Sequence, residues 1–140
     1  MSNQINLNGI IISDDDILAK DQDAPDNTTV DGNGGSFDIG NFQEGSLEVV
    51  ARVGSVALGL TDANVLTIAL HDSADNSSFT ALGTVYTITA AAGSGVKAAG
   101  TLLGKLIVPS NARRYVKAVI TSNDASTTGK LDVFFTYLPR

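Results

Sequence analysis

The sequence predicts an all-β protein that folds as an antiparallel β-sandwich or barrel. From residue 46 onward, apolar and polar residues alternate with a period of two in most segments, as they do in strands with one buried face. Clusters of Gly, Asn, Asp and Ser separate these segments, and such residues favour turns. No helix is expected, because glycines at 93 and 95 interrupt the alanine-rich stretch 90–92. A chain of 140 residues is long enough for one domain with its own core.

About eight strands are expected, each bounded by turn residues. In the last of them, Leu131, Val133 and Phe135 face one side, while Phe134 and its polar neighbours face the other. The same alternation in earlier segments indicates half-buried antiparallel strands. The expected strands span residues 5–12, 36–39, 46–54, 64–71, 78–89, 101–108, 114–122 and 130–138.

The charge of the chain is concentrated near its N-terminus. Residues 1–31 contain seven aspartates and one lysine, which accounts for the whole formal charge of −6. Residues 32–140 contain eight acidic and eight basic side chains and are neutral. Phosphate contacts need clustered Lys and Arg, so this distribution argues against nucleic acid as a partner and against anionic membrane surfaces.

This composition divides the chain into an N-terminal arm, residues 1–35, and a β-sandwich, residues 36–140, within one domain. In the arm, residues 5–12 are expected to pack as an edge strand and residues 13–34 to form a long, mobile surface loop. The alternative is an arm that becomes ordered only against a neighbouring molecule.

The inventory of reactive side chains is small. There is no cysteine, so neither disulfides nor thiolate metal sites can form, and His71 is the single histidine. A zinc site needs several imidazoles or thiolates, and nothing around His71 resembles the nucleophile turn of a Ser-His-Asp hydrolase. We therefore expect neither an enzyme nor a cofactor. No apolar window is long enough for a membrane span, and the N-terminus lacks the features of a secretory signal, so synthesis in a cytoplasm is expected.

Two acidic segments are candidates for binding a hard cation such as Ca²⁺, which prefers several oxygen ligands. The first combines the run Asp14, Asp15 and Asp16 with Asp21, Asp23 and Asp26, but it lacks the EF-hand order, and a solvated loop is favoured. The second is residues 72–78, for which an Asx-type hairpin turn is favoured.

The residues expected to contact a partner come from two places. Arg113 and Arg114 form a dibasic pair before Tyr115, and Arg and Tyr are enriched at interface hot spots. They could clamp a partner carboxylate, or instead one Arg could pair within the fold while the other is solvated. The expected partner interface comprises Ile10, Ile11, Ile12, Asp14, Asp15, Asp16, Arg113, Arg114 and Tyr115.

From residue 36 to 138 the order of features resembles a family of small phage proteins. A short strand reads Ser36-Phe37-Asp38-Ile39-Gly40, and an alternating strand follows at residues 47–53. Next come a strand that leads from Leu66 into the segment Asp72 to Phe79, a block with a proline and an Arg-Tyr pair from Pro109 to Ile120, and a final strand after Gly129. This pattern is similar to that of the jelly-roll cement proteins of short-tailed phages, of the type first described on a Bordetella phage. The acidic arm departs from it.

The resemblance implies a jelly-roll sandwich that binds the outside of a mature capsid and stabilises it by bridging capsomers. It implies the major capsid protein as a partner, self-association as a homodimer or homotrimer, and a place on the virion exterior after synthesis in the host cytoplasm. The alternative is a carbohydrate-binding or adhesin-like β-sandwich module of a tail or cell surface.

Overall fold

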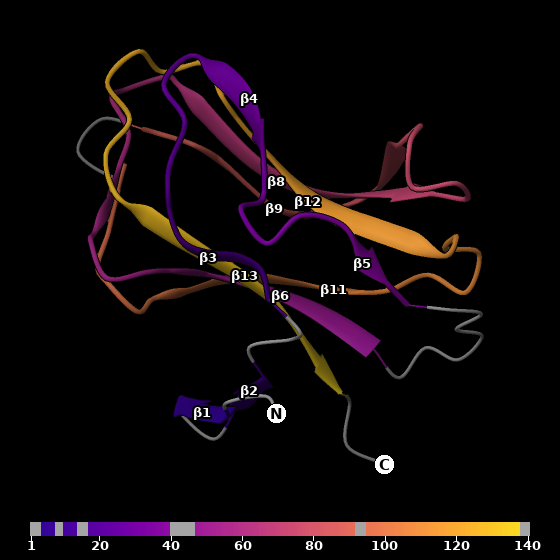
Figure 1. Cartoon of the computed structure of the whole chain (residues 1–140). Coiled ribbons are helices and arrows are strands. Elements are labelled where there is room, and N and C mark those ends of the chain that lie inside the picture. The colour runs from indigo at the N-terminus through magenta and orange to yellow at the C-terminus, as the bar shows by residue number, and fades with distance from the viewer. Residues whose placement is uncertain (1–3, 8–9, 14–16, 40–46, 92–94, 138–140) are drawn as a thin grey trace.

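The computed structural model describes residues 4–7, 10–13, 17–39, 47–91 and 95–137 of the chain. Within these ranges the chain forms strands, turns and loops and no helix, and two antiparallel sheets face one another (Figure 1). The all-β sandwich predicted from the alternation is confirmed.

The first sheet, here named the β6 sheet, has four strands. The second, the β8 sheet, has five, because two short strands lie end to end along the same neighbour, β12. In spatial order the β6 sheet contains β11 (Leu102–Ile107), β6 (Leu47–Val53), β13 (Lys130–Tyr137) and β3 (Ile17–Asp23). The β8 sheet contains β4 (Thr28–Asp31) and β5 (Phe37–Asp38), then β12 (Tyr115–Ser122), β8 (Val65–Ser73) and β9 (Thr80–Thr89).

The strand pairs are nested within one another. The first long strand β3 pairs with the last, β13; β4 and β5 pair with β12; β6 pairs with β11; and β8 pairs with β9. With β4 and β5 counted as one, these are eight principal strands, divided between two sheets as in a jelly roll. The nested order brings the beginning and the end of the described sandwich together in the β6 sheet.

The core lies between the two sheets and is built by the residues that alternation assigns to one face. In β13 the inward side chains Leu131, Val133 and Phe135 are buried, and the Phe135 ring meets Phe37 with ring centroids 5.1 Å apart. The other strands contribute Leu18, Ala19, Leu47, Val49, Ala51, Val53, Leu66, Ile68, Leu70, Val85, Val116, Ala118 and Ile120.

The sandwich is closed along one edge by a close approach of β11 and β9. A Cβ on Gly104 of β11 would lie 2.4 Å from the carbonyl oxygen of Val85 in β9. Only glycine fits at this distance, and the approach brings two edge strands of different sheets together.

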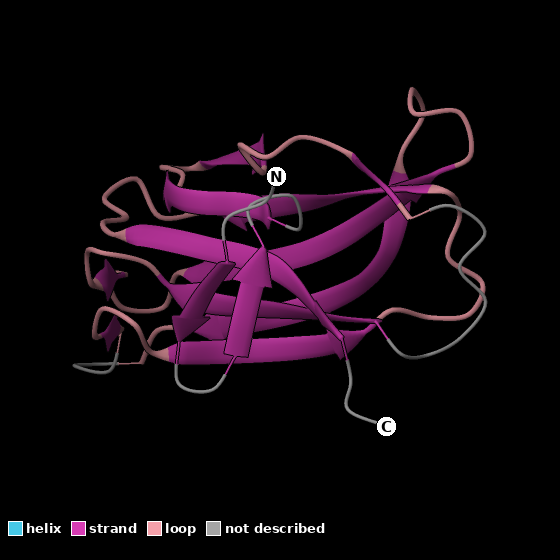
Figure 2. Cartoon of the chain, turned by 60° about the horizontal axis from the view of Figure 1, so that its bottom comes forward, coloured by secondary structure: helices cyan, strands magenta, loops and turns pink. Residues whose placement is uncertain are grey.

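Two further pairs lie outside the sheets. Strands β7 (Leu58–Gly59) and β10 (Val96–Lys97) form a small ribbon at one end of the sandwich. Strands β1 (Gln4–Leu7) and β2 (Ile10–Ser13) form an N-terminal hairpin that, among the described strands, pairs with nothing but itself. The hairpin lies outside the β6 sheet, with β2 near β13 (Figures 1 and 2).

The structure corrects the interpretation of the arm. The described residues of the range 13–34 are not a surface loop, because β3 and β4 are integral strands of the two sheets. Leu18 and Ala19 of β3 are fully buried in the core. The expected single strand over residues 5–12 is also wrong, since this segment is a hairpin. The first strand of the sandwich therefore begins at Ile17 instead.

Candidate partner-binding surface

The outer face of the β6 sheet, which points away from the core, carries an unusual mixture of residues. Register places Phe134 of β13 between Ile17 of β3 and Val50 of β6, and Val50 faces Lys105 of β11. The row is apolar across three of its four strands. An antiparallel sheet with one solvated face has polar residues there, so this row indicates a face that is covered or that binds something.

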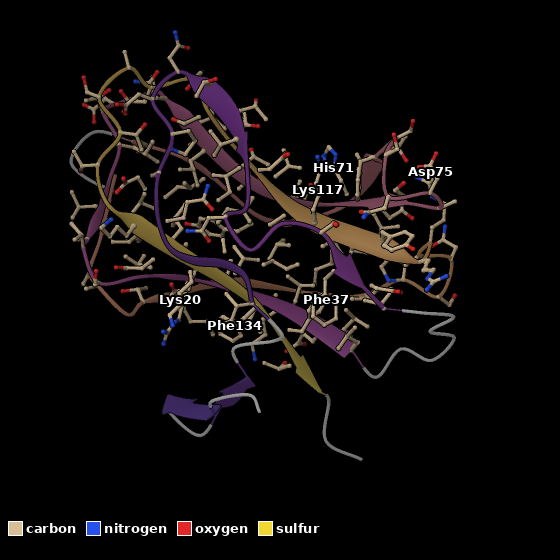
Figure 3. The ribbon with its side chains drawn as sticks, in the orientation of Figure 1. Lys20, Phe37, His71, Asp75, Lys117 and Phe134 are labelled. Carbon is tan, nitrogen blue, oxygen red and sulfur yellow. The ribbon has the colours of Figure 1, made fainter. Side chains whose placement is uncertain are left out.

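Phe134 and Val50 form a small apolar cluster separate from the core. Their exposed fractions are 2% and 1%, and Ile17 packs against them. The Arg52 guanidinium lies 5.6 Å from the centre of the Phe134 ring, which is within the range of a cation–π contact. Figure 3 shows Phe134 on the hairpin side of the molecule, away from His71 and Lys117 of the β8 sheet.

The same outer face exposes apolar side chains on β11. Leu102 is 50% exposed and Ile107 is 53% exposed, and they lie opposite Arg52 and Glu48 of β6. Lys105, between them, forms a loose ion pair with Glu48 at 3.9 Å. Two large aliphatic side chains on one edge strand give this half of the face an apolar surface that a protein partner can bury.

An ion pair between Arg52 and Asp132 lies at the end of this face near β3. Arg52 donates from Nε to Asp132 Oδ2 at 3.0 Å, and its terminal nitrogen lies 2.8 Å from the same oxygen. The other oxygen of Asp132 accepts the backbone N–H of Asp21 at 2.6 Å. Asp21 in turn accepts the backbone N–H and the hydroxyl of Ser55, and these bonds lower the pKa of its carboxyl. Asp21 has a positive φ of 45°, which marks a break in the regular pairing of β3.

A cavity of about 530 Å³ opens at this end of the outer face. Its apolar side is built by Ile17, Ala19 and Phe134. Its polar side contains the Arg52–Asp132 pair, and the turn before β11 forms part of the wall. The remaining lining residues are Lys20, Asp21, Val53, Gly54, Ser55, Ala99 and Gly100. A volume of this size is in the range of sites that bind small molecules or side-chain anchors.

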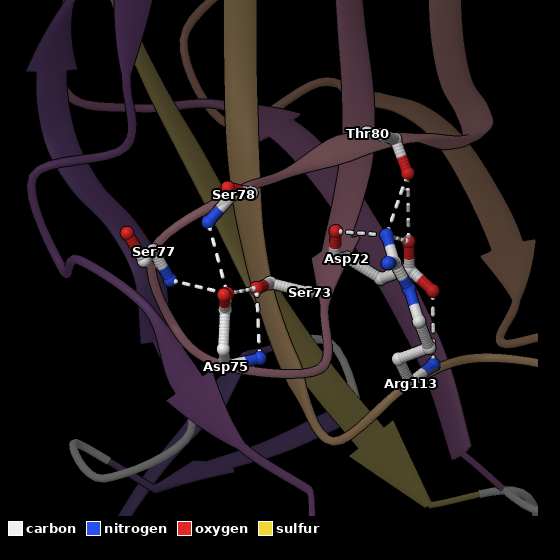
Figure 4. Close-up of polar contacts among 7 residues, drawn as sticks. All are labelled: Asp72, Ser73, Asp75, Ser77, Ser78, Thr80 and Arg113. Carbon is white, nitrogen blue, oxygen red and sulfur yellow. Dashed lines mark hydrogen bonds and ion pairs between the residues drawn. The ribbon is translucent and has the colours of Figure 1, made fainter.

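Arg113, one of the predicted contact residues, makes its hydrogen bonds to residues of its own chain (Figure 4). Its guanidinium donates to the Asp72 carboxylate at 2.8 Å, to the Asp72 carbonyl at 2.7 Å and to the Thr80 hydroxyl at 2.6 Å. Its backbone N–H donates to the other carboxylate oxygen at 2.9 Å. The Arg113 bonds lower the pKa of Asp72, a buried carboxyl. Arg113 therefore matches the alternative in which one arginine pairs within the fold.

Arg114 also has a partner in its own chain. It meets Asp38 through Nε and one terminal nitrogen, at 2.9–3.1 Å, and lies 5.2 Å from the centre of the Tyr115 ring. Both members of the ion pair are exposed, so the pair is within reach of a ligand. Arg114 and Tyr115 thus remain on the surface at the start of β12, in the β8 sheet, whereas Phe134 belongs to the β6 sheet.

The predicted contact residues of the arm are only partly described. Ile10, Ile11 and Ile12 belong to β2 in the hairpin outside the β6 sheet. Asp14, Asp15 and Asp16 lie outside the described residues. The structure therefore places the isoleucine strand near β13 of the β6 sheet, whereas Arg113 and Arg114 directly precede β12 of the β8 sheet.

The two segments considered for cations have different outcomes. Asp75 accepts the backbone N–H groups of Ser77 and Ser78 and the hydroxyl of Ser73, and these bonds lower its pKa to about 2 (Figure 4). The expected Asx-type turn is confirmed here. In the described part of the chain, no three His, Cys, Asp or Glu side chains gather as metal ligands would. Asp23 of the other segment is paired with Lys130 at 2.8 Å.

The outer face of the β8 sheet is polar by contrast. Thr29 meets Thr121 at 3.0 Å and Thr67 meets Thr87 at 3.1 Å, hydroxyl to hydroxyl, and register joins Thr121 to Thr67 in one row across four strands. Lys117 lies nearby, paired with Asp31 at 3.0 Å. His71 is half-buried, and desolvation lowers its pKa. The threonine hydroxyls and the Lys117–Asp31 pair are satisfied within this face, which is hydrated.

Sequence reasoning missed Arg52, Leu102, Ile107 and the cavity. One signal was available, since alternation assigns Phe134 to the polar side of its strand. A large aromatic residue at an outward position indicates something beyond the sandwich core. The pairing of Phe134 with both Ile17 and Val50 could not be read from local pattern, because it requires the nested strand order.

Comparison with known proteins adds no relative. No protein-family model matches the chain, and no curated protein matches it. In the described residues no helix has the length and apolar character needed to cross a membrane. The outer face of the β6 sheet carries exposed aliphatic side chains, an ion-paired guanidinium and a cavity. These features suit the binding of a partner.

Proposed function

We propose that this protein is a non-enzymatic structural component of a phage virion. It binds the outer surface of the mature capsid and stabilises the shell by bridging neighbouring capsomers. Its partners are the major capsid protein and further copies of itself, as a homodimer or homotrimer, and it needs no cofactor. It is made in the host cytoplasm and ends on the capsid exterior.

The observation that carries this proposal is the outer face of the β6 sheet. A rigid jelly roll presents the exposed side chains Leu102 and Ile107 and the cavity beside Arg52 on one side of the molecule. The N-terminal hairpin lies on that same side. A surface of this kind is suited to a protein partner, because apolar area and Arg are enriched at interface centres.

The bridging role is supported by avidity, since several weak contacts to the capsid can together give tight binding. A domain of this size that touches one capsomer through a single patch binds modestly. Self-association around a local symmetry axis makes the second contact intramolecular, so avidity raises the overall affinity without a new type of contact. The sandwich, residues 17–140, has twelve acidic and nine basic side chains and a formal charge of −3, which suits attachment to protein rather than to the packaged genome.

The test is the copy number of this protein in purified virions. Particles from a lysate of the source phage are banded, and this chain is quantified against the major capsid protein by mass spectrometry. A simple ratio to the capsid subunits, the same in every preparation, is the expected result. Complete absence from particles would contradict the proposal. A few copies per particle would instead favour the adhesin-like tail module.

A further inference from the structure

We propose that the cavity on the outer face of the β6 sheet is an anchor pocket for a protein partner. It takes one large apolar side chain from an extended segment of that partner, and Arg52 donates a hydrogen bond to a backbone carbonyl beside that side chain. Naming the capsid protein as the source of the segment rests on the proposed function. The chemistry of the pocket is independent of it.

The floor of the cavity selects for an apolar group. Ile17 and Phe134 belong to the cluster on the outer face, and Ala19 lies beside them in β3. Phe134 and Ala19 are already buried, so an apolar side chain that enters the cavity removes apolar area from water chiefly at the partly exposed Ile17 and on the partner itself. Burial of apolar area of this kind favours association.

The acidic groups of the cavity already have donors. Both oxygens of Asp132 accept hydrogen bonds, from Arg52 and from the backbone of Asp21. Both oxygens of Asp21 accept from Ser55. A cationic ligand would have to compete with these bonds, so the carboxylates stabilise the pocket wall rather than attract a positive charge.

Arg52 provides the polar half of the recognition. Its bonds to Asp132 use Nε and one terminal nitrogen, which leaves the other terminal nitrogen able to donate. The guanidinium is held by Asp132 on one side and by the Phe134 ring beneath it, so little of its freedom remains to be lost on binding. A backbone carbonyl is the acceptor that every extended protein segment offers.

Exposed apolar side chains also lie in the neighbourhood of the cavity. Leu102, half exposed, lies opposite Arg52 in register, and Val56, also about half exposed at 47%, follows the lining residue Ser55 in sequence. Neither side chain lines the cavity itself, but register and sequence place each of them next to a residue that does. A small isolated ligand would leave them in water, whereas a protein segment that enters the cavity covers them, which favours a protein as the occupant.

The turn before β11 offers a matched pair of variants. Ala99 lines the cavity and is exposed, whereas its exposed neighbour Ala98 is not among the described lining residues. Ala99→Trp therefore fills the cavity from its wall, while Ala98→Trp adds the same indole to the same turn outside it. Neither residue belongs to the core, so both variants are expected to fold.

The first experiment uses a minimal probe on the full chain. Backbone amide shifts are followed by NMR while N-acetylphenylalaninamide is added, with N-acetylglycinamide as the probe without a side chain. The phenylalanine probe is expected to shift the amides of Gly54, Ser55 and Gly100 in wild type and in Ala98→Trp, and not in Ala99→Trp. Shifts that are absent in wild type, or equal in Ala99→Trp, would overturn the pocket chemistry.

The second experiment asks where the segment comes from. Wild type and both variants are added to source-phage particles from which this protein has been stripped, and binding is measured by co-sedimentation. Ala99→Trp is expected to bind at least tenfold more weakly than Ala98→Trp. Equal binding of the two variants would overturn the assignment of this pocket to the capsid contact. If wild type itself fails to bind while the phenylalanine probe still marks the cavity, the proposed function fails and the pocket chemistry holds.

Discussion

Arg113 donates hydrogen bonds to both carboxylate oxygens of Asp72. Its backbone N–H donates to one oxygen at 2.9 Å, and its guanidinium donates to the other at 2.8 Å. Asp72 is near the end of β8, and Arg113 precedes β12, so the contact ties the loop before β12 to its neighbouring strand. Thr80 at the start of β9 joins the same guanidinium at 2.6 Å. Three strands of the β8 sheet therefore meet at one buried carboxylate.

Asp72→Asn tests this junction. The substitution keeps the shape of the side chain but removes the charge that Arg113 binds, so we expect the free energy of unfolding to fall by about 2 kcal/mol. Asp38→Asn is the matched control, because the Asp38–Arg114 pair is exposed, and we expect a loss below about 1 kcal/mol. Urea denaturation of both variants measures the difference. Equal losses would show that burial of Asp72 adds nothing to its contact.

The stability of the fold should fall in acid. The folded-state pKa of Asp75 is about 2, below the value of 3.8 for the free side chain, and that of Asp72 is lowered in the same direction. As the pH falls, the unfolded chain binds protons first, so stabilisation that is complete above about pH 4 is lost towards pH 2. The urea midpoint measured across this range should therefore decrease. Asp75→Asn, which cannot titrate, should show a shallower decrease, and an unchanged slope would contradict this assignment.

Gly104→Ala tests the closure of the sandwich edge. The added Cβ would lie 2.4 Å from the Val85 carbonyl oxygen, so β11 and β9 must separate, and we expect a loss of about 2 kcal/mol or more. The control is Gly35→Ala, where a Cβ meets nothing but the φ of +75° disfavours alanine, for an expected cost of about 1 kcal/mol. Thermal unfolding ranks the two variants. A smaller effect at Gly104 than at Gly35 would contradict the close approach.

Truncation tests where the sandwich begins. Removal of residues 1–13 takes away the hairpin alone, and we expect the shortened chain to keep its β-sheet circular dichroism and a cooperative unfolding transition. Removal of residues 1–31 also takes away β3 and β4 with the buried Leu18, and we expect that chain to be unfolded. Cooperative folding of the second truncation would show that β3 and β4 are dispensable.

Much of the fold follows from local pattern. Alternation predicted one buried and one outward face for the segments that form β6, β8, β12 and β13, and in each of them every second residue does lie in the core. The Asx turn around Asp75 was also predictable, since its hydrogen bonds lie within a few residues of one another.

The first strand was missed for a physical reason. After Ile17, Leu18 and Ala19, strand β3 continues with charged and polar residues, and the positive φ of Asp21 interrupts the alternation. Those acidic side chains are accommodated by distant residues such as Ser55 and Lys130, which no local pattern reveals. The candidate surface was missed for the same reason: its row of outward apolar residues exists only once β3, β13 and β6 are aligned.

The nested strand order has a consequence for how the chain reaches this state. The pair β8–β9 closes over a short connection, and each further pair encloses the one before it, up to β3 with β13. Loop-closure entropy and sequence separation therefore increase from the innermost pair to the outermost, which predicts slow folding that starts at the β8–β9 hairpin and proceeds outward. During synthesis β3 is the first strand of the two sheets to leave the ribosome but has to wait for β13, so the sandwich strand made earliest is among the last to be paired.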